Sequence, residues 1–230
     1  MGGGASKVKD GQAKAVEDHY AGKSPPATKT APSTKPDVKK SSGLPPRPRT
    51  ASGTFLRILT VNDIYMLDNY PNVCAAKKAA LAEAASLDCK VISTLPGDFL
   101  SPCTLTAIDG GRGMTEALNQ AMFDYVILGN HEFDFGMSVP VARMETFNGK
   151  CINSNVSSAP ISSLPRYDVL PVGDKNVLIG GFLTKDTSIY APSNIPSVTP
   201  APDAAAAIWE EATKALGKPP DVRSAPCLLS

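Results

Sequence analysis

Three apolar segments, each followed closely by a carboxylate or amide side chain, constrain the fold of this 230-residue chain more than any other feature. All three are rich in β-branched and aliphatic residues, as buried strands are. They cover residues 55–61, 89–95 and 125–129. Asp98 comes 35 residues after Asp63, and Asn130 comes 32 residues after Asp98. Because one β-α-β unit takes about 30 residues or more, this spacing predicts three parallel strands of an α/β sheet.

The three polar residues are expected to meet at one edge of that sheet. Ligand sites of open α/β sheets lie at the carboxyl ends of the strands. Asp63, Asp98 and Asn130 would each offer an oxygen to the same crevice there. Two carboxylates and an amide oxygen in one place repel each other or stay unsatisfied unless a cation lies between them. The pattern therefore predicts a metal site.

The third segment leads into a cluster of polar residues. The sequence from Asp124 to Gly136 is DYVILGNHEFDFG, in which Gly129 ends the strand. Four polar residues then follow within five positions: Asn130, His131, Glu132 and Asp134. A polar turn with a satisfied histidine would explain this stretch alone, but the two other strand ends favour a functional site.

Motifs at all three strand ends resemble those of the calcineurin-like metallophosphoesterases, in the branch that contains the 5′-nucleotidases. They are VND at 61–63, PGDF at 96–99 and LGNHEFDFG at 128–136. The resemblance extends over roughly residues 55–216. It implies an α/β fold of the αββα sandwich type, in which two packed sheets are flanked by helices. It also implies that residues 54–230 are the N-terminal portion of such a domain.

The resemblance further implies a function and a role for each residue. The family's members are metal-dependent phosphoric ester hydrolases with two divalent cations, which would be manganese, zinc, iron or magnesium. Asp63 would hold one cation, Asp98 would bridge both, and Asn130 would hold the second. His131 would face the phosphate as a catalytic group, with Asp134 orienting its ring. The 5′-nucleotidase branch implies a nucleoside 5′-phosphate as the substrate.

The first strand end departs from the family pattern. The family usually has Asp-x-His here, with both residues binding the first metal, whereas this chain has Asp63-Ile64-Tyr65. A neutral tyrosine, with a pKa of about 10, is a poor ligand for a divalent metal. A phenolate can bind iron. Two alternatives therefore remain: a first metal site that is weakened or altered, or one in which Tyr65 is a ligand.

The end of the sequence is a second departure. After its last helix the family continues with a strand that closes on a histidine and later with a Gly-His-x-His segment, and both supply metal ligands. This chain reads KPPDVRSAPCLLS instead, and its two histidines are His19 and His131. Asp221 and Val222 can begin a strand, but the proline at position 226 makes the segment a poor continuation.

We therefore expect a fold that is incomplete on its C-terminal side. With Asp63, Asp98 and Asn130 as ligands, each cation would have at most two protein ligands, whereas catalytic zinc sites use three and a water. This chain is expected not to hydrolyse phosphate esters at an enzymatic rate. The alternative to an enzyme is a non-catalytic scaffold or remnant of the same fold, tethered to membranes by its N-terminus.

Residues 1–53 form a basic tail of distinct composition. They contain ten Lys or Arg against four Asp or Glu, seven prolines and few large apolar residues. Such a segment cannot bury enough surface to offset its ordering entropy, so we expect it to be disordered. Its start, MGGGASK, matches the N-myristoylation pattern with Gly2 as the acceptor. An ordinary glycine-rich start is the alternative.

The location of the protein is expected to follow from this tail. One myristoyl chain binds membranes marginally, and the tail's lysines would add attraction to anionic lipids. Simple solubility is the alternative role of these charges, and without interleaved aromatic residues no nucleic-acid binding is expected. No apolar run approaches the roughly 18 residues of a membrane helix. Five cysteines without C-x-x-C spacing favour reduced thiols and a cytoplasmic protein, membrane-associated where Gly2 is acylated.

The remaining segments give further expectations. A helix at 73–87 is expected to carry Lys77, Lys78 and Glu83 on a solvated face. The GGRG at 110–113 favours a turn over a phosphate cradle because it does not follow a strand. Trp209 is expected to anchor the core under a helix at 202–216. Other expected elements are a helix at 114–123, strands at 151–156, 167–172 and 176–183, and a loop at 190–202.

Overall fold

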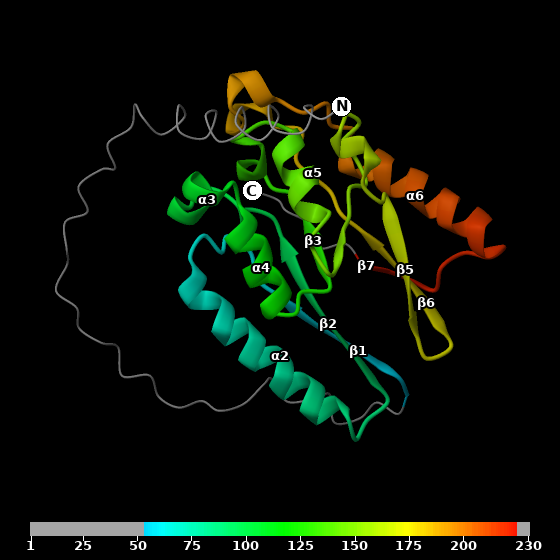
Figure 1. Cartoon of the computed structure of the whole chain (residues 1–230). Coiled ribbons are helices and arrows are strands. Elements are labelled where there is room, and N and C mark those ends of the chain that lie inside the picture. Colours follow the sequence, from blue (N-terminus) through cyan, green and yellow to red (C-terminus); the bar gives the residue numbers. More distant parts are fainter. Residues whose placement is uncertain (1–52, 225–230) are drawn as a thin grey trace, which may run out of the picture.

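The first of two sheets joins the three predicted strands in one parallel array. The structure is a computed structural model that describes the backbone of residues 53–224 and the side chains of residues 53–222. The sheet has the order β1-β2-β3-β4, and all its pairings are parallel (Figure 1). Its strands are β1 (Phe55–Thr60), β2 (Cys89–Pro96), β3 (Tyr125–Ile127) and β4 (Lys150–Cys151). The parallel arrangement predicted from the spacing is confirmed.

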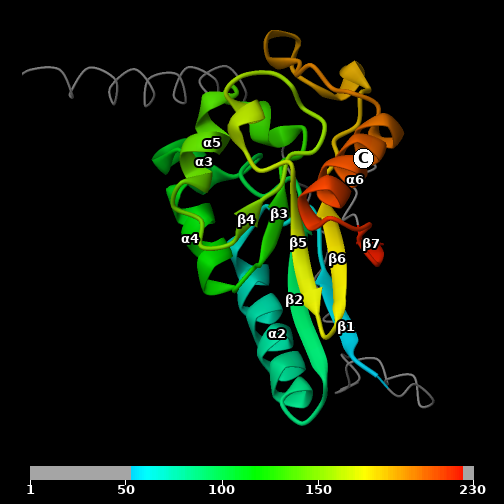
Figure 2. The ribbon, with the colours of Figure 1, turned by 90° about the vertical axis from the view of Figure 1, so that its right-hand side faces the viewer.

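Helices cover one face of this sheet (Figure 2). They are α2 (Tyr70–Ala84), α3 (Thr104–Asp109), α4 (Arg112–Gln120) and α5 (Ser138–Met144). The largest apolar cluster of the described residues includes Leu95 of β2 and Val126 of β3, together with Met114 and Leu118 of α4. None of these four side chains is exposed to solvent. Burial of this apolar surface is the main force that holds the helices on the sheet.

The second sheet packs on the opposite face of the first. It contains β5 (Tyr167–Val172) and β6 (Lys175–Gly180), which form an antiparallel hairpin, and β7 (Val222–Ser224), which pairs with β6 in parallel. Helix α6 (Ala201–Leu216) covers its outer face (Figure 1). Alternation along β6 explains this placement, since Val177 and Ile179 pack toward the first sheet and Leu178 packs toward α6.

The layers are therefore helix, sheet, sheet and helix, which confirms the predicted αββα sandwich. Between the two sheets lie Ile92, Tyr125 and Ile152 of the first layer with Leu170 and Val172 of the second. Short 3₁₀ helices occupy the connecting segments: η1 (Leu67–Asn69), η2 (His131–Phe133), η3 (Ile161–Ser163), η4 (Thr187–Ile189) and η5 (Pro192–Asn194).

Several predicted element boundaries were wrong. Helix α2 begins at Tyr70, earlier than expected, because a proline is tolerated in the first turn of a helix, and it ends at Ala84. The strand expected at 151–156 is reduced to Lys150–Cys151, and Val156 forms an isolated bridge with Val198. Within the loop expected at 190–202 lies η5, and α6 already begins there. The segment after residue 220 does form a strand, β7, despite its unfavourable sequence.

The GGRG stretch is a turn only at Gly110 and Gly111, because Arg112 and Gly113 are already the first residues of α4; helix α3 before it was not predicted. Gly110 has a φ of 68° and ends α3, and Gly111 has a φ of 86° and precedes α4. The carboxylate of Asp109 accepts the backbone N–H groups of Gly111, Arg112 and Gly113 at 2.7–3.1 Å. These donors are therefore already used within the turn.

The predicted solvated face of α2 was wrong for one residue. Lys78 and Glu83 are exposed, but Lys77 is only 4% exposed. Its ammonium donates to the carboxylate of Asp124 at 2.5 Å, to the hydroxyl of Ser93 and to a backbone carbonyl. Lys77 therefore joins α2 to the first sheet, because these three acceptors compensate for the burial of its charge.

The core role predicted for Trp209 is confirmed in part. Trp209 is half-buried and packs against the cluster between α6 and the second sheet. The fully buried anchors of this helix are smaller: Ala204, Ile208 and Ala212. Gly217 ends the helix in the left-handed conformation, with a φ of 69°.

Gly2 and the rest of the basic tail lie outside the described residues. Among residues 53–224, no helix is both long and apolar enough to cross a membrane. The four cysteines within this range, at positions 74, 89, 103 and 151, form no disulfide with one another.

Candidate functional site

The loops after β1 and β2 bring two predicted carboxylate ligands together at one edge of the first sheet. Asp63 and Asp98 both adopt the left-handed backbone conformation, with φ values of 57° and 58°, which is uncommon for residues with a side chain. Asp98 is 3% exposed. The hydroxyl of Tyr65 donates to Oδ1 of Asp63 at 3.0 Å and to Oδ2 of Asp98 at 3.4 Å. One phenol therefore lies between the two carboxylates.

The loop after β3 packs directly against Asp98. The backbone N–H of His131 donates to Oδ1 of Asp98 at 3.1 Å. Gly129 permits this approach, because a Cβ at that position would lie 2.1 Å from the same oxygen. Burial raises the pKa of Asp98; the hydrogen bond from His131 opposes this rise, and the carboxylate of Asp63 adds to it. Asp98 is thus held between the two neighbouring loops.

His131 and Asp134, which were predicted to act together, are in direct contact in the structure. Nδ1 of His131 lies 3.0 Å from Oδ2 of Asp134, and the hydroxyl of Ser101 donates to the same oxygen at 2.6 Å. The hydrogen bond with Asp134 raises the pKa of His131, while burial lowers it. The ring also packs edge-on against Tyr65, with 6.1 Å between the ring centroids. Because Nδ1 faces Asp134, the opposite nitrogen, Nε2, is the one that can meet a ligand.

Asn130 is anchored by a segment far along the chain. Its Nδ2 donates to the carbonyl of Ile189 at 3.1 Å, which leaves Oδ1 as the atom able to ligate a metal. Asn194 donates to the carbonyl of Phe133 at 2.8 Å and ties the same two segments together. Sequence reasoning did not find these contacts, because their partners lie about 60 residues apart in the chain.

Glu132 is a residue of the site to which the sequence pattern assigned no role. It is 1% exposed, and its carboxylate accepts four backbone N–H groups from the loops after β2 and β3. Burial and the charge of Asp98 raise the pKa of Glu132, while the backbone hydrogen bonds oppose the rise by stabilising the ionised carboxylate. The sequence offered one signal of this role, because Glu132 is an acidic residue that lies between an apolar segment and the apolar Phe133.

The donor set is suited to a hard cation. Asp63, Asp98 and Asn130 offer carboxylate and amide oxygens, and magnesium is commonly bound by one or two carboxylates with waters and substrate phosphates. Within residues 53–224, no three His, Cys, Asp or Glu side chains are gathered as a metal site. The three predicted ligands therefore offer oxygen donors, which hard divalent cations prefer.

Tyr65 bears on the first metal position. Burial, together with the charges of Asp98 and Asp63, raises the pKa of its phenol well above the usual value. A protonated phenol hydrogen-bonded to both carboxylates fits this geometry. The Tyr65 oxygen lies within hydrogen-bonding distance of both carboxylates, and the two alternatives drawn from the sequence, a weakened first site and a tyrosinate ligand, both stay predictions.

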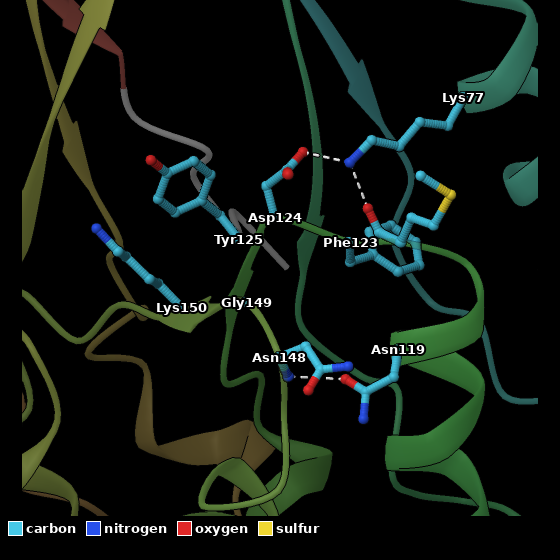
Figure 3. A pocket seen from close by; sticks show the side chains of 9 residues that line it. Lys77, Asn119, Phe123, Asp124, Tyr125, Asn148, Gly149 and Lys150 are labelled. Carbon is cyan, nitrogen blue, oxygen red and sulfur yellow. Dashed lines mark hydrogen bonds and ion pairs between the residues drawn. The ribbon is translucent and has the colours of Figure 1, made fainter. Parts of the chain in front are cut away.

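A hollow lies at the opposite end of the sheet from this site, beside the amino ends of β3 and β4 (Figure 3). It has a volume of about 460 Å³ and is lined partly by Lys77, Asp124 and Lys150. Lys77 is paired with Asp124, and Lys150 with Asp168 at 2.6 Å. Since these charged side chains are paired with one another, we interpret the hollow as a place where ion pairs hold neighbouring layers of the fold together and not as a ligand site.

The fold was compared with those of known proteins. No protein-family model and no curated protein matches the sequence. Solved structures do match. The NAD nucleotidase NadN of Haemophilus influenzae has a TM-score of 0.62 at 19% identity, covering 75% of this chain and 34% of that chain. A 5′-nucleotidase precursor of Thermus thermophilus has a TM-score of 0.58 at 18% identity, with coverages of 76% and 37%.

The architecture defines a class: this chain has the calcineurin-like phosphoesterase fold. The calcineurin-like phosphoesterase YfkN of Bacillus subtilis is similar to it with a TM-score of 0.58 at 18% identity, covering 75% of this chain and 61% of that chain. The resemblance inferred from the sequence motifs is thereby confirmed at the level of the fold. The chain spans about a third of the length of the two nucleotidase structures.

Proposed function

We propose that the strand-end site belongs to a metal-dependent phosphoric ester hydrolase of the 5′-nucleotidase type, acting on a nucleoside 5′-phosphate. The observation that supports this most is the convergence of Asp63, Asp98 and the Asn130–His131 pair on one edge of the sheet. The fold adds support, because solved structures that share it include a 5′-nucleotidase precursor and an NAD nucleotidase.

In this proposal Asp63 and Asp98 would hold the first of two divalent cations, and Asp98 and Asn130 the second. Such cations, when bound, activate a water and neutralise charge on phosphoryl oxygens. Asp98 suits a shared position because its side chain lies between the loop that carries Asp63 and the loop that carries His131. The hydrogen bond from Nδ2 of Asn130 to the carbonyl of Ile189 fixes the orientation of the amide, so that Oδ1 would be the atom that binds the cation.

His131 would bind and stabilise the phosphate. Its Nδ1 is held by Asp134, which is itself held by Ser101, so the imidazole is preoriented with Nε2 on the ligand side. A donor that is already oriented stabilises the charge that develops in the transition state without a reorganisation cost. Asp134 also favours the protonated ring by raising the pKa of His131, which suits contact with a phosphate dianion.

The proposal is tested by metal-dependent binding of AMP to the full chain, measured by calorimetry with and without Mn²⁺. AMP should bind more tightly with Mn²⁺, and Asp98→Asn should remove this dependence. His131→Ala should weaken AMP binding about 10- to 100-fold, because a hydrogen bond to a charged group contributes about 1.5–3 kcal/mol. Binding of AMP that is unchanged by Mn²⁺ would refute the proposal. Turnover of AMP is expected to be slow, as the small number of protein ligands implies.

The non-catalytic scaffold is the second candidate. It is favoured by the hydrogen bonds from Tyr65 to Asp63 and Asp98, because a phenol between two carboxylates competes with a cation for the same oxygens. In that case neither Mn²⁺ nor Mg²⁺ should bind at the strand ends. The same titration with metal alone separates the two candidates.

A further inference from the structure

Glu132 accepts hydrogen bonds from two loops at once. Its Oε2 accepts the N–H of Gly129 at 2.6 Å and that of Asp98 at 2.8 Å. Its Oε1 accepts the N–H of Phe99 at 2.8 Å and that of Leu100 at 2.9 Å. The donors come from the loop after β2 and from the end of β3, so a single side chain joins the two main chains.

The donor pattern requires a carboxylate. Four N–H groups need two oxygens that both act only as acceptors, and an ionised carboxylate provides them. In a glutamine, one of the two positions would be an amide nitrogen, whose hydrogens would face backbone hydrogens. Two of the four buried donors would then lose their acceptor, and an unsatisfied buried donor is costly. The chemical identity of Glu132 therefore matters, and not merely its size.

The Glu132 carboxylate also contacts the part of the site where the backbone is strained and closely packed, at Asp98 and Gly129. Asp98 has a φ of 58°, a conformation that a residue with a Cβ adopts only at a cost and that its surroundings must enforce. The hydrogen bond from its N–H to Glu132 is one such restraint. Gly129 is bound to the same oxygen and lies against the Asp98 side chain, where a Cβ would be 2.8 Å from the Asp98 nitrogen.

We infer that Glu132 is a positioning residue, whose carboxylate clamps the loop after β2 to the loop after β3. The clamp sets where Asp98 stands relative to Asn130 and His131, and thereby the spacing of the ligand oxygens. Glu132 is buried beneath these residues and acts through Asp98. This role rests on the proposed function, because it is the spacing of metal ligands that the clamp would set.

The first test compares Mn²⁺ affinity, measured by electron paramagnetic resonance, between the full-length wild-type chain and Glu132→Gln. Loss of a residue that orients a metal ligand typically weakens metal affinity about 10- to 100-fold, and we expect an effect of that size. Gly129→Ala should produce a similar loss, since its Cβ would displace Asp98 without altering Glu132. Glu116→Gln, the same change at an exposed glutamate of α4, is the matched control and should bind Mn²⁺ as the wild type does.

Wild-type affinity in a folded Glu132→Gln variant would overturn the inference. A second measurement needs neither a variant nor a metal: amide hydrogen exchange of the wild-type chain. The N–H groups of Gly129, Asp98, Phe99 and Leu100 should exchange at least about a hundredfold more slowly than those of exposed loops. Rapid exchange at these four positions would overturn the clamp. Failure of the wild type to bind Mn²⁺, combined with slow exchange, would refute the proposed function and leave the clamp itself standing.

Discussion

Lys77→Met tests how the helix layer is joined to the first sheet. The Lys77 ammonium donates to Oδ2 of Asp124 at 2.5 Å (Figure 3). It also donates to the hydroxyl of Ser93 at 2.9 Å and to the carbonyl of Met122. Methionine keeps an unbranched apolar side chain of similar length, so no cavity is expected. The substitution therefore removes one buried charge and its donors while it preserves the packing.

The magnitude follows from what the partners retain. Removing one member of a buried ion pair costs about 3–5 kcal/mol, because the remaining charge is left uncompensated. The Asp124 side chain, however, is 38% exposed, so water can solvate part of its charge. It also keeps the N–H of Ser93 at 2.7 Å, and the Met122 carbonyl keeps the Ser93 hydroxyl at 2.9 Å. We therefore expect the free energy of unfolding to fall by about 2–3 kcal/mol.

Urea denaturation, followed by the fluorescence of the single tryptophan and by circular dichroism, measures this loss. Lys78→Met is the matched control, because it makes the same change at the next, exposed position of the same helix. An exposed substitution of this kind should change stability by no more than about 0.5 kcal/mol. Equal losses for the two variants would refute the conclusion that Lys77 joins the layers.

Three further predictions concern other parts of the molecule. Tyr65→His should tighten binding of the first metal, because an imidazole is a metal ligand in its neutral form; metal content by elemental analysis decides this, and unchanged occupancy would contradict it. Burial alone would raise the pKa of Asp168, but hydrogen bonds from Lys150 and Tyr125 lower it, so this carboxylate stabilises the fold above about pH 4 and the gain is lost as the pH falls further. Asp168→Asn should then lower the stability at pH 7 and reduce the further loss of stability below about pH 4, measured as the urea midpoint at several pH values. A loss of stability in acid equal to that of the wild type would contradict this. Gly2→Ala should move the protein from membranes to the soluble fraction if Gly2 is acylated, and an unaltered, salt-insensitive distribution would rule out the anchor.

Local sequence patterns were sufficient for much of the architecture. The spacing of three apolar segments predicted β1, β2 and β3 as parallel neighbours, and glycine predicted where several elements end. Gly173, with a φ of 59°, lies in the turn between β5 and β6, and Gly217 ends α6. These features can be predicted because apolar periodicity and the tolerance of glycine for positive φ depend on residues adjacent in the chain.

The motifs also identified which residues stand at the strand ends, but not how they are held there. Asp98, His131 and Asp134 could be named from their positions after β2 and β3. The bond from the His131 backbone to Asp98, and the position of the Tyr65 hydroxyl between two carboxylates, appear only in the folded chain. Their geometry depends on the left-handed backbone conformation of Asp63 and Asp98 and on the packing of the neighbouring loops.

Only the tertiary structure decided the burial and the partners of three polar residues. Lys77 was predicted to lie on a solvated face with Lys78 and Glu83, yet it is buried and its acceptor Asp124 lies 47 residues further along the chain. Asn130 and Glu132 likewise bond to groups 59 and 32–34 residues away. A buried charge or amide is stable where its partners are supplied, and those partners are brought to it by packing of the sheets and helices, which no local sequence pattern records.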